Sequence, residues 1–489
     1  MISLAVAASC PIWAIVVPLV GAALTILWPR RATFVGAAAT LTTLTVVTAL
    51  IAQIVRAGVQ RYAVGGWGAP LGIDLYADGL SAILLAITAA VAAGVSLYGL
   101  RYFRAVSVLA YFWTLWLFMW AALNALFLSG DIFNLYVTLE LVGLSAVALV
   151  ALAGGGAALT GALRYLLVSL VGSASYLLGV ALLYGQYAVL DIASLGAQVQ
   201  PDTVTWIAMA AMFAGLMLKT ALFPLHFWLP AAHGAAPAPV SAVLSGLVVK
   251  ASFYMLVRLW LQLFPVTVPA PGQLLGALGA AAILWGSIQA LRQERLKMLL
   301  AYSTVAQIGY LFLVFPLSGT VAAQTAWLGV LMFIASHALA KSALFLCAGN
   351  ILRYYGHDRV HKLGGAARGE PVTFFALGLA GVSLIGLPPS GGFTAKWLLI
   401  EAAMASGQWW WVLVMVTGAF LAATYVFRVL GDGLISGTVS ARRQVVAPGM
   451  AGAALLLALG ATVLGFLAVP VDELRQIGWP LVAVRGGQP

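Results

Sequence analysis

Four lysines of this 489-residue chain lie inside long apolar stretches. They are Lys219, Lys250, Lys341 and Lys396. A charge at the centre of a bilayer costs about 2.5 kcal/mol or more, so a functional role is the first hypothesis for such residues. A desolvated lysine can lose its proton, whereas arginine stays protonated. One such lysine could be a structural ion pair, but four together predict a proton path through a membrane.

One carboxylate stands in equally apolar surroundings. Glu140 lies in 129-SGDIFNLYVTLELVGLSAVALV-150, whereas the other acids fall at loops or at the ends of apolar stretches, as Glu401 does. A buried carboxylate must either be protonated or have a cation beside it. Glu140 is therefore a candidate member of the same path.

The histidines divide in the same way. His337 and Lys341 are four residues apart and share one helix face, which favours a proton relay over a packing role. We expect His226 to face a cavity beside Pro224 and His233 to lie at the membrane interface. His357 and His361 stand in a basic loop, where we expect them to be solvated.

Two of the lysines adjoin helix breaks. Pro224 follows Lys219 by five residues, and 388-PPSGG-392, with Pro388 and Pro389, precedes Lys396. Breaks at membrane depth are tolerated where the freed backbone lines a protein cavity. Prolines that only kink the helices would explain the breaks but not the adjacent lysines.

Composition fixes the class of protein, because 63% of the residues are apolar and only 8% are charged. The chain also has repeated apolar runs of about 18 residues or more, and such runs are transmembrane helices. The chain is predicted to be an all-α polytopic membrane protein with about fourteen of them. The predicted spans are 11–28, 33–54, 77–98, 108–128, 132–153, 161–185, 204–230, 240–262, 272–291, 298–315, 325–350, 373–400, 408–430 and 449–470.

The spans suggest two repeats. Spans four to eight and nine to thirteen form two five-helix units, each with a broken, lysine-bearing fourth helix, which are helices seven and twelve of the chain. Because five is odd, consecutive units have opposite orientations, as in transporter inverted repeats. The predicted parts are an N-terminal three-helix segment, two repeats, and a C-terminal helix with its tail, at 1–104, 105–265, 266–432 and 433–489.

Basic residues predict the orientation, because they concentrate in cytoplasmic loops. If both termini are outside, fifteen basic residues lie inside and five outside, which favours that arrangement in a bacterial inner (plasma) membrane. The inside set is Arg30, Arg31, Arg101, Arg104, Arg164, Arg292, Arg295, Lys297, Arg353, Arg359, Lys362, Arg368, Arg428, Arg442 and Arg443. The outside set is Arg56, Arg61, Arg258, Arg475 and Arg485.

No cofactor or metal is expected. The two cysteines are far apart and carry no metal-ligand spacing, so iron–sulfur, haem-c and zinc sites are unsupported. The net charge of +11 is explained by basic loops, and no nucleic-acid partner is expected.

Several segments resemble a family, in order from about residue 65 to 430. They include 219-KTALFPLHFWLPAAH-233, 297-KMLLAYSTVAQIGY-310, 337-HALAKSALFLCAG-349 and 386-GLPPSGGFTAKW-397. They are similar to the antiporter-like subunits shared by Mrp cation/proton antiporters, respiratory complex I and membrane-bound hydrogenases. The 65-GGWGAPLGI-73 opening and the chain length are most similar to the D subunits of Mrp antiporters.

The resemblance implies roles for matching positions. Glu140 would pair with Lys219, Lys250 would continue the polar line, His337 and Lys341 would bridge the halves, and Lys396 would be the terminal lysine. Where the family often has Asp before the KxLLAYS motif, this chain has Arg295 beside Glu294, which puts that loop interaction in doubt. Polar residues that could carry water along the path, or simply pack helices, are Ser169, Ser173, Ser303, Thr304, Gln307 and Tyr310.

The function expected is a proton-translocating subunit of a multisubunit Na⁺ or K⁺/proton antiporter, in which separation of Glu140 from Lys219 sends the lysine's proton onward. The alternative is a proton-pumping subunit of a complex I-like NADH–quinone oxidoreductase or a membrane-bound hydrogenase. A solute permease fits less well, because the intramembrane polar residues suit protons better than a larger solute. No redox or hydrolytic site is expected in the chain itself.

Overall fold

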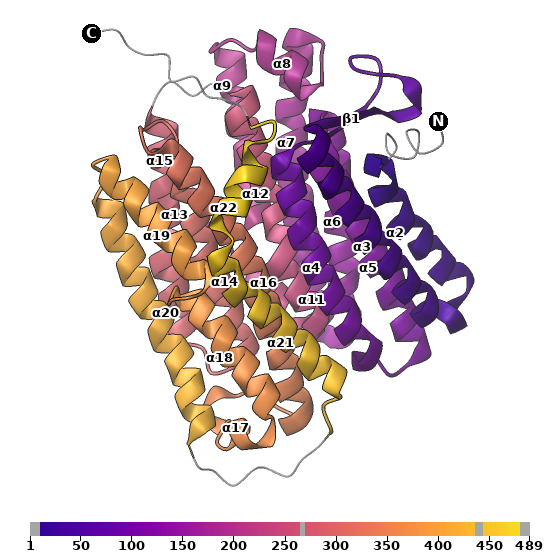
Figure 1. Ribbon diagram of the computed structural model, residues 1–489, viewed down its shortest axis with the longest axis vertical. Coiled ribbons are helices and arrows are strands. Elements are labelled where there is room, and N and C mark those ends of the chain that lie inside the picture. The colour runs from indigo at the N-terminus through magenta and orange to yellow at the C-terminus, as the bar shows by residue number, and fades with distance from the viewer. Residues whose placement is uncertain (1–9, 265–268, 436–443, 480–489) are drawn as a thin grey trace.

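The computed structural model describes residues 10–264, 269–435 and 444–479, so Arg442, Arg443 and Arg485 lie outside the described residues. The described part is a bundle of long, roughly parallel helices (Figure 1). It contains 12 helices that are long and apolar enough to cross a membrane. The shorter apolar α2 and α18 complete the predicted set of fourteen, with α9 and α10 forming one span and α18 and α19 another.

The N-terminal segment consists of three helices and a hairpin. Its helices are α2 (Cys10–Leu27), α3 (Ala32–Ala57) and α4 (Gly79–Tyr102). Strands β1 (Gln60–Ala63) and β2 (Asp74–Ala77) pair antiparallel, with Gln60 opposite Ala77. Asp78 then caps α4 by accepting a hydrogen bond from the Ser81 backbone N–H at 2.9 Å.

The first five-span group follows. It comprises α5 (Val106–Leu128), α6 (Ile132–Ala151), α7 (Gly155–Tyr187), the short α8 (Ile192–Gln198), α9 (Thr203–Thr220), α10 (Leu229–Ala235), α11 (Ala238–Val243), η3 (Leu244–Val248), α12 (Val249–Arg258) and η4 (Leu259–Leu263). The elements α11 to η4 are one continuous helix in which η3 and η4 are π-helical. The fourth span is broken between α9 and α10, as predicted.

The second five-span group has a matching order. It comprises α13 (Pro269–Leu291), α14 (Leu296–Phe312), α15 (Val314–Leu317), α16 (Ala323–Tyr355), η5 (Val360–Lys362), α17 (Ala366–Gly369), α18 (Pro371–Ile385), α19 (Gly391–Ala405) and α20 (Trp410–Leu434). Its fourth span is broken between α18 and α19, where Gly386 adopts φ 91° and ends α18. The C-terminal part, α21 (Pro448–Val463), η6 (Leu464–Phe466) and α22 (Ala468–Gln476), packs on α16 and α4.

Two helices form the centre of the molecule. The most apolar 18-residue stretches of α16 and of the helix from Ala238 to Leu263 are wholly buried. The outer helices, in contrast, expose large apolar side chains. A helix that is apolar all round belongs in a protein core or a membrane. The central helices carry Lys250, His337 and Lys341, which places the candidate path at the core.

Candidate functional site

Glu140 and Lys219 form a direct ion pair. Glu140 is on α6 and Lys219 is the penultimate residue of α9, and Lys219 Nζ lies 2.8 Å from Glu140 Oε1. The side chains are 6% exposed for the lysine and 16% for the glutamate. Lys219 also donates to Ser169 Oγ at 3.0 Å. Gly143 leaves room for this contact, since a Cβ there would stand 2.7 Å from Ser169 Oγ.

The helix break places Lys219. Helix α9 ends at Thr220, and Ala221 adopts a left-handed φ of 60°, after which the chain is non-helical as far as Trp228. A cation in the last turn of a helix is stabilised by the carbonyl end of the helix dipole. Lys219 therefore sits between a carboxylate and a helix C-terminus, two surroundings that favour its charged form.

Lys250 lies at the beginning of α12, buried and directly after the π-helical turn η3. It donates to the Ser245 carbonyl of that turn. The Ser245 hydroxyl in turn contacts Thr304 of α14 at 2.8 Å. Among the described residues, Lys219 is the only one of the four lysines in an ion pair. Lys250 therefore has a backbone carbonyl as its hydrogen-bond acceptor. Ser245, which supplies that carbonyl, also contacts α14 of the second group through its hydroxyl.

Lys341 lies fully buried on α16. It donates to the Leu300 carbonyl at 2.7 Å and to Ser303 Oγ at 2.5 Å, both on α14. His337 is one turn earlier, and neither of its ring nitrogens has a hydrogen-bond partner among the described residues. It lines a cavity of about 10 Å³ together with Gln307, Ser336 and Ser383. A cavity of about that volume is at the lower limit for one water molecule.

Lys396 lies on α19 beyond the second break. Its Nζ donates to the carbonyls of Leu384 at 3.0 Å and Ile385 at 2.8 Å, which are the last residues of α18. It also lies over the Tyr310 ring, 4.5 Å from the centroid. Lys396 thus caps the preceding half-helix and holds the two halves of the span together.

The lysine-bearing elements contact one another in sequence. Helix α9 packs on α12, η3 packs on α16, and α16 packs on α14 and α19. The chain of contacts therefore runs from the Glu140–Lys219 pair through the centre of the bundle to Lys396. The four lysines selected from the sequence therefore lie on helices that form an unbroken series of packing contacts.

His233, expected at the membrane interface, is covered by protein. It is completely buried on α10, its ring faces Phe345 at 5.4 Å, and its ring nitrogens have no hydrogen-bond partner among the described residues. Lys341, Lys297 and Lys250 all act on it electrostatically. The short helix after the break turns it inward, which the count of residues along a continuous span did not anticipate. His226 is also buried and stacks on Phe223 at 5.6 Å.

A basic pocket of about 800 Å³ opens close to His233. Its lining includes Gly156, Arg164, residues 234–237, Arg295 and Lys297. Lys297, expected among the inside loops and helix ends, is the second residue of α14; it is buried and donates to the Ala236 carbonyl. The pocket thus reaches the backbone next to His233 from the end of the molecule that carries most loop arginines.

The remaining polar residues are placed variously. Ser303 and Thr304 both donate to the Leu300 carbonyl, so they line the Lys341 contact. Tyr310 donates to the Met415 carbonyl at 3.0 Å. Ser173 is buried, and its hydroxyl has no hydrogen-bond partner among the described residues.

The loop before α14, where the family often has an aspartate, is contacted by the carboxylate of Asp358 from a distant segment. Arg295 pairs with Asp358 at 3.0 Å, and the Lys297 backbone N–H donates to the same side chain at 3.3 Å. Asp358 therefore caps α14 and supplies the acid missing from position 295.

Residues 129–422 match the family described as NADH:quinone oxidoreductase/Mrp antiporter, TM. The N subunit of the NADH-quinone oxidoreductase of Desulforudis audaxviator (strain MP104C) is 38% identical over 411 residues, covering 83% of this chain and 81% of that protein. The D subunit of the Na(+)/H(+) antiporter of Bacillus subtilis (strain 168) is 28% identical over 386 residues, with 78% and 77% covered. In the solved Mrp complex from Dietzia sp. DQ12-45-1b, one chain matches the fold with a TM-score of 0.86 at 24% identity, covering 98% of this chain and 99% of that one.

Proposed function

Because this chain belongs to the NADH:quinone oxidoreductase/Mrp antiporter family of transmembrane proteins, we propose that it is a proton-translocating subunit of a multisubunit Na⁺ or K⁺/proton antiporter. The observation that carries the proposal is the Glu140–Lys219 pair, with a buried lysine and a partly buried glutamate, at one end of a line of buried lysines. Both relatives named above are subunits, so the working unit is an assembly with other membrane subunits.

The contacts of the lysines suggest how a proton moves. A carboxylate favours the charged form of its partner, so Lys219 keeps its proton while the pair is closed. Carbonyl and hydroxyl oxygens accept hydrogen bonds from both charged and neutral lysine. Lys250, Lys341 and Lys396 can therefore gain and lose protons without losing their partners.

Opening of the Glu140–Lys219 pair is the proposed switch. Two charges 4 Å apart attract by about 4 kcal/mol at an effective dielectric constant of about 20. Loss of that attraction changes the equilibrium for proton release roughly a thousandfold. The proton then passes to Lys250 and onward through His337 and Lys341 to Lys396, with Ser303, Thr304 and Gln307 beside the route.

The basic pocket supports an access route from one side. It leads to Lys297 and to the backbone next to His233, which lies within electrostatic reach of Lys250 and Lys341. We place this pocket on the cytoplasmic side of a bacterial inner membrane and both termini outside, since most loop arginines lie at the pocket's end of the molecule. Labelling of a cysteine at Gly449, at that end, in intact cells and in inverted vesicles tests the orientation.

A redox-driven pump is the second candidate. It is favoured by the 38% identity to the N subunit of an NADH-quinone oxidoreductase. Purification of the native complex separates the two functions: co-eluting antiporter subunits, together with cation-driven proton movement in proteoliposomes, support the first. A quinone- or NADH-reactive module in the complex would contradict it.

A further inference from the structure

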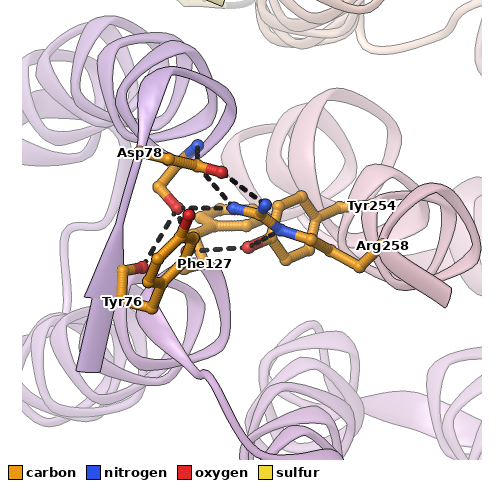
Figure 2. A network of polar contacts seen from close by, with 6 residues as sticks. Tyr76, Asp78, Phe127, Tyr254 and Arg258 are labelled. Carbon is orange, nitrogen blue, oxygen red and sulfur yellow. Dashed lines mark hydrogen bonds and ion pairs between the residues drawn. The ribbon is translucent and has the colours of Figure 1, made fainter. Parts of the chain in front are cut away.

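Asp78 and Arg258 form a second ion pair, between the beginning of α4 and the end of α12 (Figure 2). The guanidinium donates to both carboxylate oxygens, at 2.5 and 2.6 Å. It also donates to Tyr254 and Ser81, each at 2.9 Å. Both side chains are buried, although both lie near the ends of predicted spans. The pair is therefore a buried, two-pronged clamp in which four of the five guanidinium N–H groups are hydrogen-bonded.

The clamp joins separate parts of the chain. Asp78 precedes α4 and caps it, whereas Arg258 ends α12. The Tyr254 hydroxyl donates to the Phe127 carbonyl near the end of α5, at 2.8 Å. The Gly79 backbone N–H donates to the Ile477 carbonyl just after α22, also at 2.8 Å. One buried polar cluster thus joins α12 to the start of α4 and to α5, and the start of α4 is joined in turn to the C-terminal part.

Helix α12 has an unusual setting. It runs from Val249 to Arg258 between two π-helical turns, η3 and η4. Lys250 lies near its beginning and bonds back to Ser245 of η3. Arg258 lies eight residues later, about 12 Å along the helix axis. Since helices bend at π-bulges, the packing around α12 alone leaves its orientation adjustable, and the clamp constrains its C-terminal end.

Stability alone does not explain a buried ion pair. Replacing such a pair with apolar residues of similar volume is often neutral or stabilising, and the best-attested role of a buried polar pair is to specify one arrangement. We propose that Asp78 and Arg258 are positioning residues that fix the rotation of α12 and thereby hold the Lys250 amine on the proton line. The proposal rests on the proposed function, because it assigns Lys250 to that line.

The test replaces the pair with apolar residues in the assembled complex, as Asp78→Leu with Arg258→Met. We expect normal assembly and thermal stability, transport at least about tenfold slower, and at least about tenfold faster hydrogen exchange of backbone amides in residues 244–263. The pH profile of transport should also be displaced, since Lys250 changes position relative to His233 on α10 and to His337 and Lys341 on α16, which interact with it.

A second variant guards against failure of the first to fold. Arg258→Lys keeps the charge but loses the two-pronged geometry, and it should show the same displaced pH profile in a stable complex. Arg475→Lys is the matched control, because Arg475 pairs with Asp472 at 2.5 Å on α22, which carries none of the four lysines. Wild-type transport and hydrogen exchange in the assembled double variant, or in Arg258→Lys, would overturn the positioning role. That result would not contradict the proton line itself, which the Glu140→Ala variant tests separately.

Discussion

The Nζ of Lys219 lies 2.8 Å from a carboxylate oxygen of Glu140, although 79 residues separate the two along the chain. The contact joins the end of a broken helix to a neighbouring span in an otherwise apolar region. Because it is the one ion pair on the lysine line among the described residues, it is the part of the line that a change of charge can switch.

Glu140→Ala should abolish transport while leaving assembly intact. The variant removes the group that favours protonated Lys219, and an unpaired buried lysine is expected to become neutral rather than to unfold the helix. Proton movement by the reconstituted complex measures the effect. Glu401→Ala, at an exposed glutamate of α19, is the control and should transport normally. Full activity of Glu140→Ala would sink the proposed switch.

Lys219→Arg should separate pairing from proton release. Arginine keeps the ion pair with Glu140 but stays protonated, so the complex should be as stable as wild type and at least about a hundredfold slower in transport. Thermal unfolding and transport are measured on the same preparation. If the arginine variant translocates protons at the normal rate, the lysine acts only as a fixed charge.

Lys396→Met should weaken both the fold and transport. It leaves the carbonyls of Leu384 and Ile385 without their buried donor, which costs about 1 to 3 kcal/mol. We expect a lower melting temperature of the complex and loss of proton movement. A variant that melts earlier but still transports at full rate would show that Lys396 only caps α18.

His233→Phe should slow transport at least about tenfold while preserving the fold, because phenylalanine fills a similar volume without a proton-accepting nitrogen. The control is His361→Phe, at an exposed histidine of η5. Equal rates in both variants and wild type would exclude His233 from the proposed access route that begins at the basic pocket.

Gly156→Trp should obstruct the basic pocket. A Cβ at Gly156 meets no atom within 4 Å, and Gly156 lines the pocket, so a side chain there begins in open space without a clash at the backbone. Transport should fall at least about tenfold if protons enter there. Gly449→Trp is the matched control, since a Cβ at Gly449 is equally unobstructed. The same loss in both variants, or in neither, would argue against this entrance.

The sequence was informative where it broke a strong rule. A carboxylate in an apolar run and lysines beside prolines stand out because hydrocarbon penalises both, and the structure pairs Glu140 with Lys219 next to a real break. It was less informative near the ends of spans. Asp78 and Arg258 are buried by contacts with segments as distant as Ile477, and residue counting cannot show that covering.

His233 shows the second limit. Its burial depends on the direction that the chain takes after the α9 break, and a hydrophobic pattern does not encode that direction. The assignment of Asp358 to the α14 loop has the same origin, since the two segments are far apart in sequence.

Three of the four lysines rest on main-chain oxygens: those of Ser245, of Leu300, and of Leu384 with Ile385. These acceptors belong to the peptide bond, so no side-chain substitution deletes them. A scan of point mutants would therefore detect the donors of this path and miss most of its acceptors. Replacing a single amide by an ester at these positions, which weakens the carbonyl as an acceptor, would make that half of the path visible.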